Sequence, residues 1–264
     1  MQDILQQIIA HKHTEVERQK QAIPLSTLLS MASERMERTP LSMRKALAQS
    51  PTGIIAEFKR KSPSKGWLHA HAQIADILPA YQASGASACS VLTDERFFGG
   101  AFADLAQARR LITIPILRKD FIIDEYQIHQ SRALGADAIL LIAATLTVET
   151  TRTLATLAHE LNLEVLLEIH SASELSHLND NIDMLGINNR HLGSFHTDVA
   201  TSFQLVEHLK DRPTPLLISE SGISSPTTVR ELRQAGFRGF LIGETFMKTN
   251  QPGHALTTFI SNLA

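Results

Sequence analysis

Short runs of apolar residues recur along most of the chain, separated by stretches that we predict to be helical. Most of the runs are continuous rather than alternating, which is typical of parallel strands covered on both faces. The predicted strands span residues 53–60, 87–94, 114–121, 138–144, 164–170, 184–190, 216–221 and 239–246. The predicted helices between and after them span residues 74–84, 102–111, 125–134, 149–161, 171–178, 199–209, 226–235 and 254–263.

This alternation of strand and helix is the pattern of a parallel α/β protein. No glycine-rich dinucleotide turn accompanies the strands, so the pattern favours a closed (β/α)8 barrel, or TIM barrel, over an open doubly wound sheet. The length of 264 residues is close to the roughly 250 that are typical of such a barrel. We therefore expect residues 1–264 to form a single barrel domain.

The first fifty residues are more than a barrel needs. Residues 1–21 predict an amphipathic helix, which Pro24 ends, and a second helical piece follows near Ser33. Residues 1–50 are thus expected to be a helical extension. It is either a solvated segment or a lid packed on one end of the barrel, and the amphipathic pattern favours the lid.

Polar residues follow several of the apolar runs, at the carboxyl ends of the predicted strands. Glu57 and Lys59 share one strand face, and Lys119 and Glu168 end two other strands. Burying a charge within an apolar strand is costly unless the charge is paired or functional. Because the carboxyl ends of barrel strands converge on one mouth, these residues, with Asn188 and Arg190, predict an active site there.

The last two strands end in residues suited to holding a phosphate. Loops after the seventh and eighth strands of such barrels commonly form a phosphate site, and here they contain Ser221, Gly222, Gly243 and Glu244. Their backbone N–H groups can point at an anion, and glycine allows close approach. The basic loop over residues 59–67 is either a solvated charge run or a flap that closes over an anionic substrate.

Composition narrows the function further. The formal net charge of −2 gives no reason to expect a nucleic-acid or membrane partner. A single cysteine excludes an internal disulfide, and the N-terminus does not resemble a signal peptide. No run reaches about 18 apolar residues, so no membrane span and a cytoplasmic location are expected. The 12 histidines lack the spacing of metal ligands, so no metal site is predicted.

Several of these segments carry a family resemblance that covers essentially the whole chain. They are IIAEFKRKSPSKG, SVLTDERFFGG, PILRKDFIIDEYQI, GADAILLIAA, LEVLLEIH, GINNRHL, ISESGI and LIGETFM. Together they resemble indole-3-glycerol phosphate synthase, a carboxy-lyase of tryptophan biosynthesis. The resemblance implies conversion of 1-(2-carboxyphenylamino)-1-deoxyribulose 5-phosphate, the phosphorylated small-molecule substrate, to indole-3-glycerol phosphate with release of CO2 and water. It also implies that no metal or organic cofactor is needed.

The resemblance also implies roles for individual residues. Lys119 corresponds to the general acid of ring closure and Glu168 to the principal catalytic carboxylate. Lys59, paired with Glu57, is assigned to dehydration, although the division of labour between the two lysines stays open. The remaining implied roles are orientation of the catalytic groups by Asn188, carboxylate binding by Arg190, an apolar ring pocket from Phe98, Phe121 and Leu192, a flap contact from Ser62, and a place in the catalytic set for Ser221.

Three other functions fit parts of the pattern. A strand-borne lysine can form a Schiff base with a sugar ketone, as an aldolase does. A phosphoribosylanthranilate isomerase is a related phosphate-binding barrel, but its reaction needs neither the lysine pair nor Glu168. A non-catalytic phosphosugar binder would not need two lysines beside carboxylates.

One departure from the family pattern is His191, where an aspartate is expected. The chain ends after the eighth predicted helix, so we expect no fused isomerase domain, and a monomer.

Overall fold

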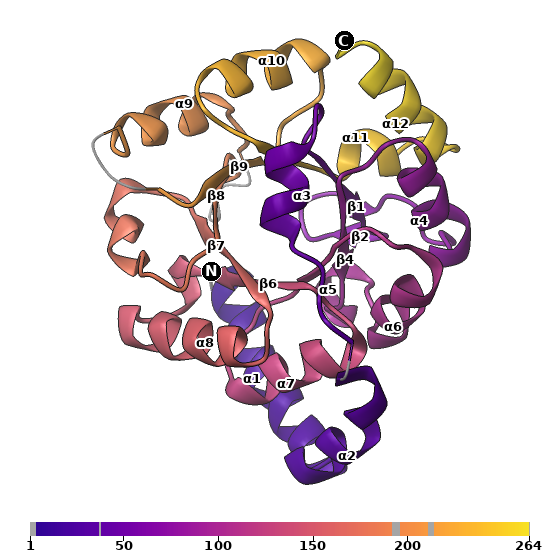
Figure 1. The fold of residues 1–264 in the computed structure, drawn as a ribbon, viewed down its shortest axis with the longest axis vertical. Helices are drawn as coiled ribbons and strands as arrows, with labels where there is room; N and C mark the ends of the chain where they lie inside the picture. The colour runs from indigo at the N-terminus through magenta and orange to yellow at the C-terminus, as the bar shows by residue number, and fades with distance from the viewer. Residues whose placement is uncertain (1–3, 37, 192–195, 211–213, 264) are drawn as a thin grey trace.

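The computed structural model describes residues 4–36, 38–191, 196–210 and 214–263. Within these ranges, eight parallel strands form a closed barrel in which β1 pairs with both β4 and β10 (Figure 1). In the order of the chain they are β1 (Ile54–Phe58), β4 (Ala88–Leu92), β5 (Ile116–Lys119), β6 (Ala138–Ile142), β7 (Glu164–Ile169), β8 (Met184–Asn188), β9 (Leu216–Glu220) and β10 (Gly239–Ile242). The (β/α)8 prediction is therefore confirmed, and every predicted strand contains an observed one.

Helices surround this barrel as an outer ring. They are α4 (Ile74–Ala83), α6 (Phe102–Leu111), α7 (Glu125–Leu134), α8 (Val148–Glu160), α9 (Ala200–Glu207), α10 (Pro226–Gln234) and α12 (Pro252–Ser261). The predicted helix at 171–178 is instead a 3-10 segment, η2 (Ala172–His177). Its polar side chains bond to local backbone and to one another, as in the hydrogen bond from Ser176 Oγ to the Ser173 carbonyl, and so compete with α-helical bonding.

Several short elements were not predicted, because one or two turns leave little periodicity in a sequence. Three are helical: η1 (Ala143–Thr145), α5 (Glu95–Phe98) and α11 (Glu244–Met247). The other two, β2 (Lys61–Ser62) and β3 (Gly66–Trp67), form an antiparallel hairpin within the basic loop. This hairpin directly follows β1, and we call residues 59–67 the flap below.

Side-chain alternation along the strands explains where polar groups lie. Inward positions such as Ile55, Leu117, Leu166 and Ile218 fill the barrel interior, whereas their neighbours along each strand face the helices. On these four strands, the next inward position, two residues further along, is a charged residue: Glu57, Lys119, Glu168 and Glu220. The apolar interior thus gives way to charge at the carboxyl end, where a substrate can reach it.

The N-terminal extension packs on both ends of the barrel. It contains α1 (Ile4–Ala22), α2 (Leu25–Met36) and α3 (Met43–Gln49), with Pro24 between the first two, as predicted. Met43 and Leu47 of α3 are fully buried in the inner core, and α3 lies across the barrel opening in Figure 1. Ser42, which caps α3, bonds to Glu164 at the start of β7, so α3 closes the amino-terminal end.

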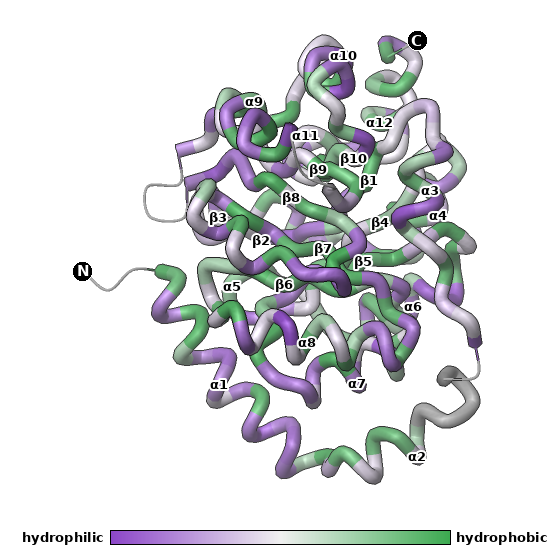
Figure 2. Tube along the Cα trace, turned by 60° about the vertical axis from the view of Figure 1, so that its left-hand side comes forward, coloured by the Kyte–Doolittle hydropathy of each residue, from purple (hydrophilic) through white to green (hydrophobic). Residues whose placement is uncertain are grey.

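At the opposite end, α1 lies beside the mouth of the barrel. Ile4, Leu5 and Ile8 line the cavity described below, and the buried Lys12 forms ion pairs with Asp94 and Asp120. Figure 2 shows α1 and α2 running along the outside of the barrel, where both contact α7. The extension is therefore packed rather than solvated. The sequence had indicated a lid at one end, but had not indicated the plug formed by α3.

Candidate active site

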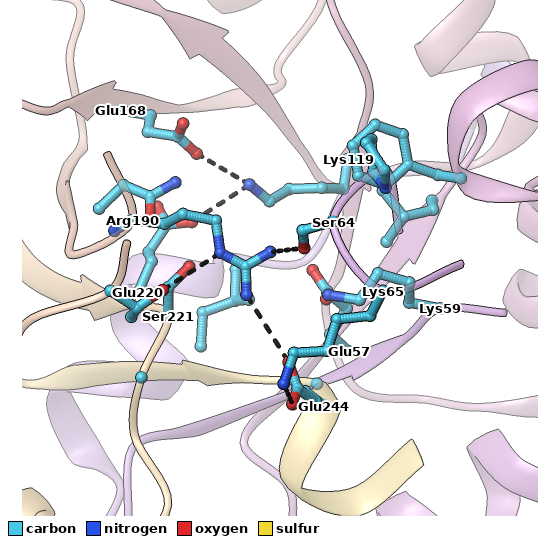
Figure 3. Close-up of a pocket in the computed structure, with 18 of the residues that line it drawn as sticks. Glu57, Lys59, Ser64, Lys65, Lys119, Glu168, Arg190, Glu220, Ser221 and Glu244 are labelled. Carbon is cyan, nitrogen blue, oxygen red and sulfur yellow. Dashed lines mark hydrogen bonds and ion pairs between the residues drawn. The ribbon is translucent and has the colours of Figure 1, made fainter. Parts of the chain in front are cut away.

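A cavity of about 600 Å³ opens at the carboxyl ends of the barrel strands. Its wall includes the last inward residues of β1, β5, β7, β8, β9 and β10, together with the start of α1. Figure 3 shows that the charged side chains from these strands point into one space. The convergence expected from the sequence is therefore present.

Lys119 lies at the centre of this charged cluster. Its ammonium Nζ is 2.8 Å from Glu168 Oε2 and 3.2 Å from Glu220 Oε2. Burial by itself would lower the pKa of Lys119, but the charges of Glu168, Glu220 and Glu57 outweigh burial and raise it. Lys119 is therefore an ammonium at neutral pH, which makes it a proton donor rather than a nucleophile.

The two carboxyl groups beside Lys119 have pKa values that are shifted in opposite directions. Burial alone would raise the pKa of Glu168, but Lys119 and His170 lower it. Burial raises the pKa of Glu220 to about 7, aided by the charges of Glu168 and Glu57 and opposed by Lys119. One ammonium thus stabilises one ionised carboxylate, while the other carboxyl group can hold a proton near neutral pH.

Glu220 is a residue of the cluster that sequence reasoning missed. It ends β9 and is almost fully buried. It occupies the inward position two residues after Ile218, where alternation along the strand would have placed it. The sequence reasoning had instead selected Ser221, the next residue along the chain.

Glu57 and Lys59 form a second ion pair, with 2.5 Å between Oε1 and Nζ. Glu57 is buried and lies against Gly243, where an added Cβ would be 2.4 Å from Glu57 Oε1. Glycine at position 243 therefore leaves the space that the Glu57 carboxylate occupies. Both lysines predicted to be catalytic are thus held by carboxylates within the same cavity.

Asn188 and His170 surround Glu168 on its other side. The Asn188 side chain helps to lower the pKa of Glu168, and its Oδ1 accepts a hydrogen bond from the backbone N–H of Arg190 over 3.0 Å. His170 Nε2 is 3.4 Å from Glu168 Oε1. Burial opposes protonation of His170, but Glu174 and Glu168 raise the pKa of its ring. Sequence reasoning did not select His170, which follows β7 directly.

Ser221, Gly222, Gly243 and Glu244 line one side of the cavity. Ser221 and Gly222 both have positive φ, at 67° and 75°, a conformation that turns the chain sharply after β9. Glu244 begins α11, and its carboxylate is 2.6 Å from Lys65 Nζ and 3.6 Å from Arg190 Nη2. The sequence had predicted that these four residues lie together, and the structure brings them together.

The opposite side of the cavity is apolar. Phe98 and Phe121 both line it, with ring centroids 6.0 Å apart, and Leu140 and Ile142 of β6 continue the same surface. Aromatic pairs at this spacing form a wall on which a flat ring can pack. Leu192, assigned to this wall from the sequence, lies outside the described residues.

The flap crosses the cavity mouth from β1. Pro63, Ser64 and Lys65 line the cavity, whereas Ser62 is buried and accepts a hydrogen bond from the backbone N–H of Lys65. Ser62 thus supports the hairpin turn and is not brought to the cavity wall. Trp67 is exposed and lies over Gly99 and beside Lys61.

The structure also places the remaining sequence observations. His191 is exposed, and its backbone N–H donates to the carbonyl of His196. In the ranges that the structure describes, no cluster of three or more His, Cys, Asp or Glu side chains is arranged to hold a metal ion. The same ranges contain no helix with the length and apolarity needed to cross a membrane.

Fold and site together define a (β/α)8 barrel whose carboxyl-end cavity combines paired lysines and carboxylates with an apolar wall. The family model for indole-3-glycerol phosphate synthase matches residues 5–259. The chain belongs to that family.

Curated relatives agree along almost the full length. An indole-3-glycerol phosphate synthase from Bacteroides thetaiotaomicron is 58% identical over 262 residues, covering 98% of each chain. One from Burkholderia ambifaria is 45% identical over 258 residues, covering 97% of this chain and 98% of the relative. Among solved structures, a mutant tryptophan synthase alpha-subunit from Pyrococcus furiosus aligns with a TM-score of 0.61. It is 16% identical and covers 80% of this chain and 97% of that one, which supports the barrel fold alone.

Proposed function

We propose that this protein is an indole-3-glycerol phosphate synthase. It would close the ring of 1-(2-carboxyphenylamino)-1-deoxyribulose 5-phosphate, release CO2 and then release water. The observation that carries this proposal is the Lys119 ammonium, held between Glu168 and Glu220 in a cavity with an apolar wall. Membership of the family, with close relatives of the same name, supports the same conclusion.

Ring closure requires a proton donor at the ketose oxygen. The ring carbon that bears the carboxylate attacks the carbonyl carbon, and negative charge develops on the carbonyl oxygen. The Lys119 ammonium can stabilise that charge and transfer a proton to it, because its pKa is raised and it is protonated at neutral pH. Loss of CO2 then returns the bonding electrons to the ring and restores its aromaticity.

Dehydration requires an acid at the leaving hydroxyl and a base at the remaining C–H. We assign the acid to Lys59, which Glu57 holds at 2.5 Å. We assign the base to Glu168, whose lowered pKa keeps it ionised. A proton taken up by Glu168 can pass to a neutral Lys119 along their 2.8 Å hydrogen bond. This transfer restores the Glu168 carboxylate and the Lys119 ammonium, and Lys59 regains its proton from water.

Binding of the substrate would use three parts of the cavity wall. The Arg190 guanidinium suits the substrate carboxylate, because it can bind a carboxylate with two hydrogen bonds. Phe98, Phe121 and Leu192 would hold the aromatic ring. The backbone at Ser221, Gly222, Gly243 and Glu244 would hold the phosphate. Asn188 would orient Glu168, and Ser62 would act through the shape of the flap.

The first experiment adds the carboxyphenylamino-deoxyribulose phosphate with EDTA present and records fluorescence at indole wavelengths. We expect a rise in the wild type and none in Lys119→Ala. Borohydride treatment with substrate present tests the Schiff-base alternative, and trapping on Lys119 would support an aldolase. Tight substrate binding without a fluorescence rise would contradict the proposed activity and favour a phosphosugar binder.

Cellular location and assembly state extend this proposal. We propose that the enzyme works in the cytoplasm, supported by its membership of a family of biosynthetic enzymes. We also propose that it is a monomer, with each active site built from one chain. Light scattering after gel filtration tests the second point, because a mass of twice 29.1 kDa would contradict it.

A further inference from the structure

Glu244 presents an electrostatic problem for a phosphate site. Its backbone begins α11 beside Gly243, but its side chain adds a carboxylate to the same wall of the cavity. Burial would raise the pKa of Glu244, but Lys65, Arg190 and Lys59 together lower it. An ionised carboxylate therefore lies where a phosphate dianion would have to approach. Repulsion between them is costly unless nearby cations neutralise one of the two.

Two of these cations come to Glu244 from different parts of the chain. Lys65 Nζ, from the turn of the flap hairpin, is 2.6 Å from Glu244 Oε1. Arg190 Nη2, from the segment after β8, is 3.6 Å from Glu244 Oε2. Arg190 Nη1 also donates to Ser64 Oγ over 3.2 Å. Figure 3 shows these side chains meeting across the cavity. Glu244 thus joins the flap to the far wall of the cavity.

A phosphate group would compete with Glu244 for the same partners. Phosphate offers more acceptor oxygens and a higher negative charge than a carboxylate, so it binds an ammonium more strongly. The Lys65 side chain is half exposed on a short hairpin and can turn from one anion to the other. Arg190 can likewise leave Glu244 for the substrate carboxylate.

We infer that Lys65 is a further phosphate-binding residue, and that Glu244 holds it until the substrate phosphate displaces the Glu244 carboxylate. This inference rests on the proposed function only for the location of the phosphate at Ser221, Gly222 and Gly243. The backbone and the side chain of Glu244 would therefore have opposite effects on phosphate binding. The backbone N–H favours the phosphate, whereas the side chain competes with it for Lys65.

Binding of inorganic phosphate to the intact protein tests this inference without turnover. Calorimetry gives the dissociation constant, and fluorescence of Trp67, the single tryptophan of the chain, reports on the flap. We expect Lys65→Gln to weaken phosphate binding about tenfold, as for loss of one charge-assisted hydrogen bond. We expect Glu244→Gln to strengthen binding by a similar factor, because it removes both the competitor and the repulsion. Lys45→Gln, on the exposed face of α3, is the charge-matched control and should change nothing.

The double variant isolates the exchange between the two anions. In wild type, Lys65 must leave Glu244 before it binds phosphate, so part of its contribution is lost. Lys65→Gln should therefore weaken phosphate binding by a larger factor in the Glu244→Gln background than in wild type. An equal factor in both backgrounds would contradict the exchange. Unchanged affinity in Lys65→Gln, or weaker binding in Glu244→Gln, would overturn the inference.

Phosphate binding by Lys65 can be tested separately from the proposed synthase activity. Normal indole formation with phosphate affinity insensitive to Lys65 would leave the function standing and overturn this inference. The expected affinity changes without any indole formation would do the reverse. Failure of wild type to bind phosphate would remove the proposed phosphate site and overturn the inference with it.

Discussion

Lys119 donates a 2.8 Å hydrogen bond to Glu168 although the two residues end different strands, β5 and β7. The same ammonium also reaches Glu220 on β9. One buried cation therefore connects three strand ends. It stabilises the ionised carboxylate that we propose as a base while it remains available as an acid.

Replacing Lys119 by alanine should abolish turnover and leave the fold largely intact. Loss of the proposed acid should lower kcat by at least roughly 10²–10⁴-fold. Glu168 and Glu220 lose their counter-ion, but they open onto the cavity and can take up protons instead. Indole fluorescence measures the first effect, and circular dichroism with a thermal melt measures the second.

The matched control is Lys210→Ala, which removes an exposed lysine that forms a local ion pair with Glu207. It should leave both activity and melting temperature near wild-type values. Turnover by Lys119→Ala at a rate close to that of this control would remove Lys119 from the mechanism.

Glu220 should make the protein less stable as pH rises towards neutrality. Its pKa in the folded protein is raised to about 7, whereas an unfolded glutamate titrates at roughly 4.3. Between these values the unfolded chain loses its proton first, so the free energy of unfolding falls as pH rises and the contribution is lost above about pH 7. Below the unfolded pKa the contribution is fully present.

The variant Glu220→Gln removes this titration while keeping an oxygen that can accept from Lys119. Its free energy of unfolding, measured in urea, should therefore gain on wild type between about pH 5 and pH 8, by on the order of 2 kcal/mol. Glu207→Gln replaces an exposed glutamate and should show no such trend. A difference between Glu220→Gln and wild type that stays constant with pH would show that Glu220 is already ionised at the lower pH.

Sequence reasoning located the barrel and much of the site because both depend on local patterns. The apolar runs defined the strands, and Lys119 and Glu168 were recognisable as charges at the ends of such runs. Glu220 is also a charge at the end of an apolar run. The neighbouring Ser221 and Gly222 predicted a phosphate loop, so the end of the strand was assigned to Ser221 instead. Alternation from Ile218 would have identified it.

Contacts between distant parts of the chain could not be predicted in this way. Nothing near Lys65 in the sequence indicates that its partner is Glu244, and two-residue strands leave no pattern from which the flap hairpin could be read. Lys12 looks like any lysine on an amphipathic helix. Its burial depends on where α1 packs, and that position is set by contacts with the barrel rather than by the sequence of the helix itself.

Arg190→Ala should chiefly weaken substrate binding. The guanidinium lines the cavity and contacts Ser64 and Glu244, but it is not among the groups that hold Lys119. Loss of the bond to the substrate carboxylate should raise KM by roughly tenfold to a hundredfold, with a smaller change in kcat. Arg190→Lys keeps the charge but loses the bidentate geometry, so its KM should lie between that of wild type and that of Arg190→Ala. A KM unchanged in Arg190→Ala would contradict this role.

Lys12 should be the strongest single link between the N-terminal extension and the barrel. Its side chain is fully buried, with Nζ 3.0 Å from Asp94 and 2.9 Å from Asp120. Burial opposes the charge, but Asp120, Asp94 and Glu15 raise the pKa of Lys12. Burial would raise the pKa of Asp120, but Lys12 and Arg118 together lower it to about 2. Removing Lys12 leaves the buried Asp94 without its cation and leaves Asp120 with Arg118 alone.

Lys12→Met should therefore destabilise the protein by about 3–5 kcal/mol in urea unfolding. Lys20→Met is the control on the same helix, because Lys20 pairs with Asp124 but is 36% exposed, and it should cost about 1 kcal/mol or less. Activity of Lys12→Met should fall as well, since Asp120 adjoins Lys119 and Asp94 lines the cavity. We propose that residues 1–264 form one domain, so one unfolding transition should remain in both variants. Equal stability losses in the two variants would mean that the buried ion pairs of Lys12 do not secure α1, and that its apolar contacts do.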